Sequence, residues 1–330
     1  MAIDKAVDST KLNGAITATA DAIREKTGGT DLLTWDESKG FADVVSGISA
    51  GGGGDIDALI GRSITAIKSN LDVIGYAAFQ QCTSLTSVDM PLVTSIGDYG
   101  FQNCTSLTTA DFPLITSIGK YVFQYCKSLT SVDFPLVTSI GYSGFNGCSN
   151  LTSVNFPLVT SIDTYGFQQC TNLTSVDMPL VTSIGNNGFQ ECTNLTSVDF
   201  PLVTSIGNNG FNSCSNLTSV NFPLVTKISG SIFRNCSNLS LADFPLVTSI
   251  GSGEFRDCKQ LTKLILRSET ICTLSHISAF QGTPFASGGT GGTVYCHQEF
   301  IETYQNATNW STLYAAGTCN FVAIEGSEYE

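Results

Sequence analysis

The chain has 330 residues, of which 42% are hydrophobic and only 13% charged, and its formal net charge is −13. This composition is typical of a folded protein with an uncharged polar surface and excludes a disordered chain. The acidic balance argues against a nucleic-acid partner, because binding a phosphate backbone requires clustered Lys and Arg. No apolar run is long enough to span a bilayer, and the first residues lack the apolar stretch of a signal peptide.

Residues 1–50 are predicted to form a small helical module. Leu12, Ile16 and Ile23 give one helix an apolar stripe. The glycine-rich segment 51–55 that follows is predicted to be a hinge. A module of this size buries too little apolar surface to be stable alone. We therefore expect it to dock on another protein or to form homo-oligomers, with a leader packed on the first coil as the alternative.

A 22-residue repeat follows. Three residue types recur nine times in strict register, and these series run from Ile74 to Ile250, from Phe79 to Phe255 and from Cys82 to Cys258. A single unit cannot bury its inward-facing residues, whereas stacked units form a continuous core. We predict a solenoid over residues 56–267, which begins with an irregular capping coil, and a closing segment over residues 268–330.

Each unit is predicted to contain one short strand. Val88 and Met90 alternate inward, as a strand requires. Pro91 ends the strand, because proline cannot donate a hydrogen bond to the ladder. The remainder of the unit, which buries Ile96 and Phe101, is expected to return through a turn or one short helical twist. The predicted fold class is therefore an α/β repeat solenoid with short strands on one face.

The repeated unit, C-x-x-L-x-x-V-x-F/M-P-L-V-T-S-I-G-x-x-G-F-x-x, resembles the BspA-like leucine-rich repeat, whose units carry "IG..AF..C..L..V..P" in that order, over residues 64–267. This resemblance implies a leucine-rich repeat solenoid. The segment "VYCHQEFIETYQNATNWSTLYAAGT" resembles the closing segment of the same family. It implies a last strand and a helix ending on Asn309 and Trp310, which would cover the open end of the core.

The N-terminal segment "TATADAIREKTGGTDLLTWDESKGFADVVSGI" is similar to leader segments of tail-associated proteins from bacteriophages and prophages of gut Firmicutes. This second resemblance is confined to the predicted helical module. It implies that the chain is attached to a virion tail.

The nine repeated cysteines are predicted to be buried, reduced thiols. An odd set on one stacked column cannot pair completely, and the side chains of adjacent coils point in parallel and not at each other. Disulfide bonds are the alternative. A column of reduced thiols fits folding in a reducing cytosol or an anaerobic niche.

Neither a metal site nor an active site is predicted. Cys272, His276, Cys296 and His297 form the only His and Cys cluster, but their spacing matches no known zinc finger. No histidine precedes His276, and the chain has no nucleophile elbow and no phosphate-binding glycine motif. We therefore expect a protein without cofactor or catalytic activity.

One residue per strand forms an acidic column that should project outward. Its members are Asp89, Asp111, Asp133, Asp177, Asp199 and Asp243. A solvated acidic stripe is one interpretation, and recruitment of cations such as calcium is another. This strand face is chemically monotonous, so it is also an alternative binding surface for a repetitive ligand such as a glycan.

Positions on either side of the repeated Gly-Phe vary between units. They define a candidate binding strip with the residues Tyr76, Tyr99, Tyr121, Tyr125, Tyr142, Tyr165, Asn186, Asn187, Asn208 and Asn209. Tyrosine together with Asn, Gln, Ser and Gly is typical of adaptable binding surfaces. The alternative is that these positions vary because they face solvent.

These patterns favour a non-catalytic binding protein, with a protein or glycan on a cell surface as its partner. The leader and the absence of an export signal favour a receptor-binding component of a phage or prophage tail. The alternative is an adhesin on the bacterial surface, for which the BspA-like resemblance implies binding to host matrix proteins. A third hypothesis is a purely structural spacer.

Overall fold

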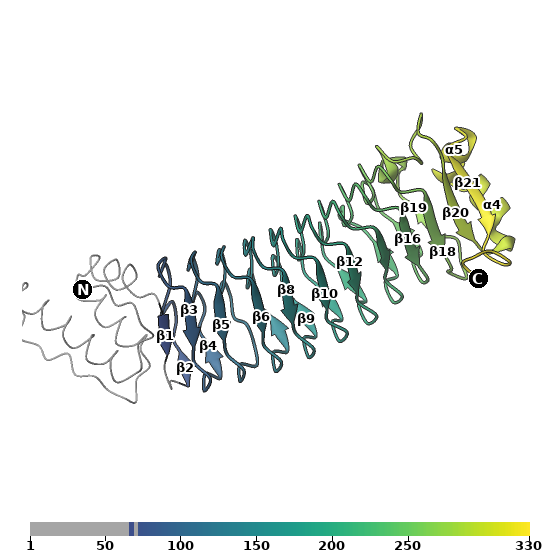
Figure 1. The fold of residues 1–330 in the computed structure, drawn as a ribbon. Coiled ribbons are helices and arrows are strands. Elements are labelled where there is room, and N and C mark those ends of the chain that lie inside the picture. The colour runs from purple at the N-terminus through teal and green to yellow at the C-terminus, as the bar shows by residue number, and fades with distance from the viewer. Residues whose placement is uncertain (1–65, 69–71) are drawn as a thin grey trace, which may run out of the picture.

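The computed structural model describes residues 66–68 and 72–330, and the side chains from Asp72 onward. These residues form one elongated, gently curved solenoid, with the first coils at one end and the C-terminus at the other (Figure 1). The predicted helical module, 1–50, and the hinge, 51–55, lie outside the described residues. The predicted solenoid fold is confirmed, and its coils repeat at the 22-residue spacing of the sequence.

One side of the solenoid is a column of parallel strands, one from each coil. From β3 onward the central residue of the strand is buried, as Val88 is, or partly buried, as Val154 is, and the flanking Ser and Asp residues are partly or fully exposed. The column consists of β1 (Ala66–Lys68), β3 (Ser87–Asp89), β5 (Thr109–Asp111), β6 (Ser131–Asp133), β8 (Ser153–Asn155), β10 (Ser175–Asp177), β12 (Ser197–Asp199), β14 (Ser219–Asn221), β16 (Leu241–Phe244), β18 (Lys263–Leu266), β20 (Gly292–Cys296) and β21 (Cys319–Ala323).

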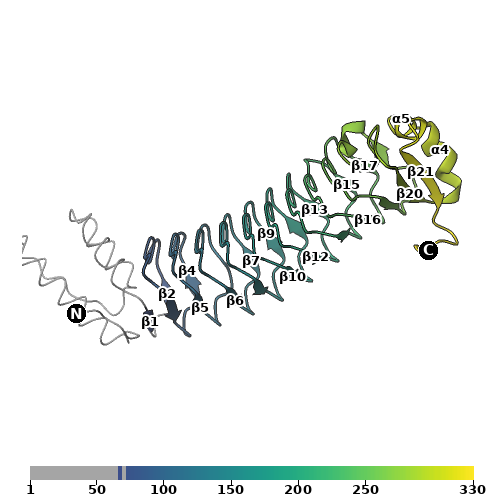
Figure 2. The same cartoon turned by 45° about the horizontal axis from the view of Figure 1, so that its top comes forward.

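A second side carries another column of parallel strands, which the sequence analysis had assigned to a turn or a helical twist. Each of these strands has only two residues, and its second residue points into the core. The column consists of β2 (Val73–Ile74), β4 (Ser95–Ile96), β7 (Ser139–Ile140), β9 (Ser161–Ile162), β11 (Ser183–Ile184), β13 (Ser205–Ile206), β15 (Lys227–Ile228), β17 (Ser249–Ile250) and β19 (Thr273–Leu274). Strands therefore lie on two faces, which both views show (Figures 1 and 2).

The third side closes each coil through tight turns that are also hydrogen-bonded between coils. The amide of Tyr99 donates to the carbonyl of Lys120 at 2.9 Å, and that of Phe101 donates to Val122 at 2.9 Å. Gly97 precedes this turn, and a Cβ there would lie 2.7 Å from the Tyr76 nitrogen of the preceding coil. Glycine is required at this point because the backbones of adjacent coils approach each other closely.

The core is a continuous column of buried apolar side chains. Its centre is a phenylalanine stack that runs from Phe79 to Phe280, with ring centroids of neighbouring coils 5.1 to 5.8 Å apart and ring planes within 13° of parallel. Each ring contacts the ring above and the ring below. Burying such a ring stabilises the fold by about 1.5–3 kcal/mol, so no coil is stable without its neighbours.

The C-terminal segment covers the end of this core with short helices and two strands. The helices are η1 (Ile277–Phe280), η2 (Gln298–Phe300), α4 (Ile301–Asn306) and α5 (Trp310–Ala315). The predicted single helix ending on Asn309 and Trp310 is instead two helices, because Asn309 adopts a left-handed conformation (φ 67°) and α5 begins at Trp310. The buried indole of Trp310 packs on Phe280, with centroids 5.7 Å apart, and donates from Nε1 to the Cys272 carbonyl at 2.7 Å.

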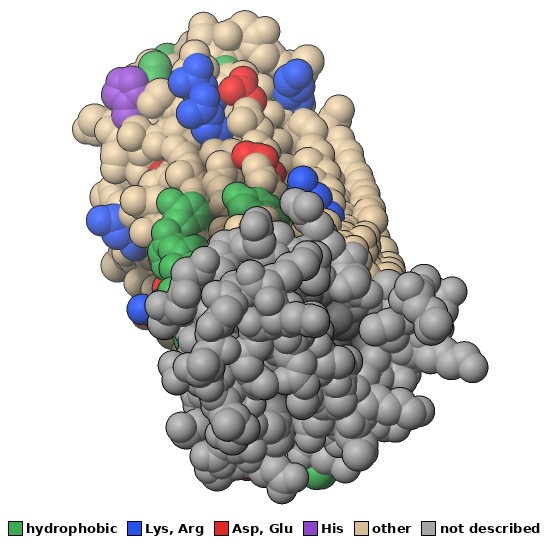
Figure 3. Space-filling model, turned by 90° about the vertical axis from the view of Figure 1, so that its left-hand side faces the viewer, with side chains coloured by type: hydrophobic (Ala, Val, Ile, Leu, Met, Phe, Trp, Pro, Cys, Tyr) green, Lys and Arg blue, Asp and Glu red, His purple; other side chains and the backbone are tan. Residues whose placement is uncertain are grey.

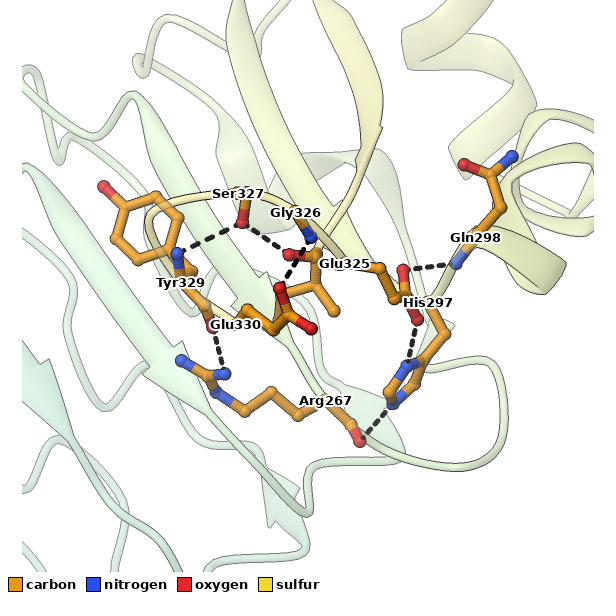
Figure 4. A network of polar contacts seen from close by, with 9 residues as sticks. Arg267, His297, Gln298, Glu325, Gly326, Ser327, Tyr329 and Glu330 are labelled. Carbon is orange, nitrogen blue, oxygen red and sulfur yellow. Dashed lines mark hydrogen bonds and ion pairs between the residues drawn. The ribbon is translucent and has the colours of Figure 1, made fainter.

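The last residues fold back over the outer face of β18 and β20 (Figure 4). The Lys263 ammonium donates to the Tyr329 hydroxyl at 2.6 Å and pairs with Glu328 at 2.8 Å. The Arg267 guanidinium binds the Tyr329 carbonyl and forms an ion pair with Asp243 at 3.1 Å. None of the helices in the described part of the chain has both the length and the apolar character needed to cross a membrane.

Candidate functional site

The candidate strip lies on the third side of the solenoid, where each coil has two residues in the left-handed conformation four positions apart. In one coil these residues are Tyr99 (φ 63°) and Asn103 (φ 60°). Both amides donate to the next coil, so the conformation is fixed by the ladder between coils. Variation at these positions is therefore constrained by backbone geometry.

Five tyrosines of the strip form one continuous row across five consecutive coils. We call this row the tyrosine strip, and it consists of Tyr76, Tyr99, Tyr121, Tyr142 and Tyr165. Successive ring centroids lie 5.5, 4.6, 5.2 and 5.4 Å apart. The pair of Tyr99 and Tyr121 is stacked, and the other three pairs meet edge to face. Partial desolvation, together with the neighbouring Tyr142 and Tyr99, raises the pKa of the Tyr121 hydroxyl.

The continuity of this row was not visible in the sequence. Tyr76 and Tyr142 occupy the first variable position of their coils, whereas Tyr99, Tyr121 and Tyr165 occupy the second. The rings nevertheless meet, because a tyrosine side chain is long enough to bridge the offset. Tyr76, at the N-terminal end of the row, is 70% exposed, and the other four are partly exposed.

Tyr125 is not part of this row. It occupies the second left-handed position of its coil (φ 58°) and is exposed. Its ring lies against Gly147 in the next coil, where a Cβ would be 2.4 Å from the ring. A glycine at that position is thus needed to accommodate the tyrosine ring.

The asparagines of the strip have structural roles. The Asn186 side chain accepts a hydrogen bond from the Asn208 amide at 2.8 Å. Asn187 (φ 56°) and Asn209 (φ 55°) are in the left-handed conformation that asparagine tolerates well. The candidate strip therefore divides into a tyrosine-rich N-terminal half and an asparagine-rich half whose residues stabilise turns.

The acidic column lies on the outer face of the first strand column, with its members aligned in register. Asp177 lies directly opposite Asp199 on parallel strands. Asn155 interrupts the column and donates from Nδ2 to the Asp133 carboxylate at 2.9 Å, and Arg267 pairs with Asp243 at its C-terminal end. Among the described residues, no group of three or more His, Cys, Asp or Glu side chains has an arrangement that could hold a metal ion.

The cysteine column is buried, and all twelve cysteines of the chain are thiols. From Cys104 to Cys258, each Sγ donates to the carbonyl of the phenylalanine 25 residues earlier at 2.9 to 3.2 Å. Desolvation raises the pKa of these thiols, to about 12 at Cys236. The predicted burial of the cysteine column is confirmed, and the raised pKa values make these thiols poor nucleophiles.

The residues of the C-terminal His and Cys cluster do not converge. Cys272 and Cys296 are buried in the core. His276 caps η1 by accepting from the Ser278 amide at 3.1 Å. His297 binds the Glu325 carboxylate at 2.8 Å and the Arg267 carbonyl at 3.1 Å, and the Glu325 contact raises the His297 pKa (Figure 4). These four side chains therefore contact different groups and do not form one site.

A row of exposed leucines, which the sequence pattern did not predict, lies at the turn between the two strands of each coil. The leucine follows the proline that ends the first strand, and the row is 37% to 48% exposed from Leu92 to Leu246. The 22-residue recurrence is the same for a core leucine such as Leu85 and for an exposed one such as Leu92, so only the structure reveals the exposure of this row. Viewed from the N-terminal end, the described surface that is visible is mostly backbone and uncharged polar side chains, with scattered charged and hydrophobic side chains (Figure 3).

A known family of repeat proteins matches this chain. The model of the BspA-type leucine-rich repeat region matches residues 62–174 and 160–285, more than half of the chain. The chain belongs to the BspA-type leucine-rich repeat family. Among curated protein sequences, none matches it.

Several solved structures of leucine-rich repeat proteins are similar to this BspA-type chain. A T. pallidum leucine-rich repeat protein is 28% identical over 44% of this chain and 72% of its own, with a TM-score of 0.42. A leucine-rich cell surface protein from Faecalibacterium prausnitzii is 24% identical over 66% and 76%, with a TM-score of 0.37. A leucine-rich repeat protein from Bacteroides ovatus is 21% identical over 77% and 88%, with a TM-score of 0.31.

Proposed function

We propose that this protein is a non-catalytic binding protein whose tyrosine strip contacts a protein partner outside the cell. The observation that supports this function is the left-handed backbone at Tyr99, Tyr121 and Tyr165 (φ 63°, 59° and 60°). A residue other than glycine or asparagine in this conformation costs of order 1 kcal/mol or more. Such outliers occur most often at binding sites and catalytic sites, where the surrounding structure holds them in place.

The later coils show what the scaffold itself requires at this position. Their residues are Asn187, Asn209, Ser231 and Gly253, and the two remaining earlier coils have Ala77 and Ser143; all six have positive φ. Asparagine and glycine are the types that adopt this conformation at little cost. The fold alone therefore favours a small residue, and the three tyrosines are better explained by a contact that they make with a partner.

A protein partner fits the strip better than a glycan does. A sugar ring packs on the free face of an aromatic ring, but neighbouring rings of the strip occupy each other's faces. Tyr99 and Tyr121 are stacked at 4.6 Å with an angle of 14° between their planes. Stacking covers the faces between these two rings and leaves their edges and hydroxyl groups, which are suited to the mixed apolar and hydrogen-bonding contacts of a protein interface.

The test replaces the three left-handed tyrosines by the residue of the later coils, in the variant Y99N/Y121N/Y165N. Binding is measured on a panel of immobilised extracellular-matrix proteins, on a glycan array and on intact cells. We expect at least a tenfold loss of affinity for a protein partner, about 1.4 kcal/mol, because aromatic contacts at the centre of an interface typically contribute more than this. The melting temperature should not fall, since relief of backbone strain offsets the lost ring contacts.

The matched control is N187S/N209S, which places the serine found at position 231 at the same turn position outside the tyrosine strip. This control should bind like the wild type. If the tyrosine variant binds every probe as well as the wild type does, the strip is a scaffold element and the protein is a spacer. Binding to glycans alone would contradict the proposal of a protein partner.

The resemblance of the N-terminal segment to phage leader segments favours a protein that acts on a phage or prophage tail. A bacterial surface adhesin is the alternative. The leader lies in residues 1–50, outside the described residues, so the tail assignment stays a prediction from sequence. Mass spectrometry of purified virions and of proteins shaved from the bacterial surface distinguishes the two. The tail assignment requires that the chain co-purifies with virions, and recovery only from the cell surface would exclude it.

A further inference from the structure

We propose that Arg234 and Arg256 form a binding site for an oxyanion, a phosphate or carboxylate group, in the last regular coils of the solenoid. The two residues occupy the same position of adjacent coils. The Asn235 amide donates to the Arg256 carbonyl at 2.8 Å, and the Phe233 amide donates to the Glu254 carbonyl at 3.1 Å. Their backbones are therefore one ladder spacing apart, about 4.8 Å.

Earlier coils carry a neutral amide at this position. From Gln80 to Gln168 each side chain donates to the amide oxygen of the next coil, and Gln190 is the last acceptor of this ladder. Asn212 does not continue the ladder, because its Nδ2 donates to Asn209 in its own coil and its oxygen accepts from Ser213. The two arginines follow Asn212, and among the described residues no amide oxygen of the column accepts from Arg234.

Both arginines have unsatisfied donors. The Nε atoms of Arg234 and Arg256 are buried and have no hydrogen-bond partner among the described residues. Asp257 lies 3.5 Å from the Arg256 Nε as an ion pair without hydrogen-bond geometry. Arg234 makes no ion pair with any residue that the structure describes. Two positive charges on adjacent coils are thus opposed by one poorly placed carboxylate.

The buried carboxylate nearby does not neutralise this pair. Glu254 accepts from the amides of Ser231 and Ile232 at 3.2 and 3.1 Å and is completely buried. Its carboxyl group therefore binds backbone N–H groups inside the turn. The guanidinium groups on the same coils remain available to a group from outside.

Guanidinium groups bind phosphate and carboxylate through two parallel N–H donors, with stronger hydrogen bonds than neutral groups make. Two of them one coil apart suit a ligand group with at least two oxygens, because each arginine can bind a different oxygen. The pair is also a local positive patch in a chain with a net charge of −13. This site is separate from the tyrosine strip and goes beyond the function proposed above.

The test uses R234Q/R256Q, which restores the glutamine of the earlier coils and should therefore fold. The melting temperature of the whole protein is measured in sodium phosphate and in sodium chloride at equal ionic strength. In the wild type we expect a rise that grows with the logarithm of phosphate concentration, as for any ligand that binds the native state. In R234Q/R256Q this rise should be lost.

The matched control is K127T/K227S, which removes the same amount of positive charge elsewhere and uses residues of other coils, Thr105 and Ser205. It should keep the response to phosphate. A phosphate response that is equal in the wild type and R234Q/R256Q, or that is lost equally in both double variants, would overturn the proposal, as would no response in the wild type.

A sodium acetate arm distinguishes the two sources of the oxyanion. A response to acetate and phosphate assigns both groups as ligands, and a response to phosphate alone assigns phosphate. The Y99N/Y121N/Y165N variant should respond to phosphate like the wild type, so failure of the tyrosine strip and failure of this site are separable.

Discussion

Glu254 is the clearest departure from the repeat at a single position. At this position most other coils have a small apolar residue, such as Gly100 or Gly210. The Glu254 carboxylate instead binds two backbone amides of the preceding coil, in a turn that has lost the usual glycine at Ser229. The side chain thus supplies the hydrogen bonds that an altered turn needs, at the cost of burying a carboxyl group.

This burial makes the stability of the protein depend on pH in a defined direction. Desolvation raises the Glu254 pKa above its ordinary value of 4.5, and the backbone N–H groups offset only part of this shift. The folded state therefore holds its proton at pH values where the unfolded state has lost it. The contribution of Glu254 to the free energy of unfolding should fall as pH rises from about 4.5 through the raised folded pKa.

Urea denaturation of the wild type and Glu254→Gln between about pH 4 and pH 8 tests this dependence. The wild type should lose stability relative to Glu254→Gln as pH increases, because only the wild type ionises here. All other carboxyl groups are common to both proteins and cancel in the difference. A difference that does not change with pH would show that Glu254 titrates normally.

At the scale of elements, the C-terminal helices replace the missing next coil. Trp310 of α5 and Tyr304 of α4 are buried against the end of the phenylalanine stack, and the Tyr304 hydroxyl accepts from the Cys272 amide at 2.7 Å. In a linear array the stability of a coil depends mainly on its own interfaces. A weakened cap should therefore affect the last coils first.

We expect Trp310→Ala to cost about 3–5 kcal/mol at this end of the solenoid. The loss should appear as local opening of the last coils, because the earlier interfaces are unchanged. Hydrogen exchange followed by mass spectrometry should show faster exchange in β17 and β19, with the amides of β7 and β9 protected as before. Uniform loss of protection along the whole solenoid would mean that the array unfolds as one cooperative unit.

The repeat made the fold predictable, but not the geometry of the coil. The inward positions of Val88, Ile96 and Phe101 follow from their 22-residue recurrence. The second strand column was missed because a strand of two residues, such as β4, is too short to show an alternating pattern. The left-handed turn at Tyr99 was missed because tyrosine seldom adopts positive φ.

The candidate site was predictable only in part, for a related reason. Variation between coils identified the side of the solenoid that differs from unit to unit. It could not separate Asn186, whose side chain binds the next coil, from Tyr165, whose ring extends the tyrosine strip. That distinction depends on side-chain conformation across coils, which no single position of the repeat encodes.

For the whole molecule, the dominant electrostatic feature is repeated negative charge. The net charge is −13, and aspartates such as Asp177 and Asp199 lie opposite each other on parallel strands. Like charges directly opposite on neighbouring strands destabilise a sheet. Asn155 relieves this repulsion at one coil by donating a hydrogen bond to Asp133.

Salt should therefore stabilise this protein. Raising NaCl from about 0.01 M to about 1 M shortens the screening length from about 30 Å to about 3 Å, so the melting temperature should increase. Asp177→Asn should raise the free energy of unfolding by roughly 0.2–1 kcal/mol and reduce the salt dependence. Thermal unfolding at several salt concentrations measures both effects, and a melting temperature that falls with NaCl would contradict them.

The strict register of the coils has a consequence for how the chain finds its fold. Each core residue meets an identical or closely similar partner 22 residues away, so docking a coil on the next-but-one coil buries nearly the same surfaces as correct docking. The core contacts therefore do not specify which coil docks on which. Only the side chains that differ between coils, such as the tyrosines and the two arginines, can distinguish docking on the correct coil from docking on another coil.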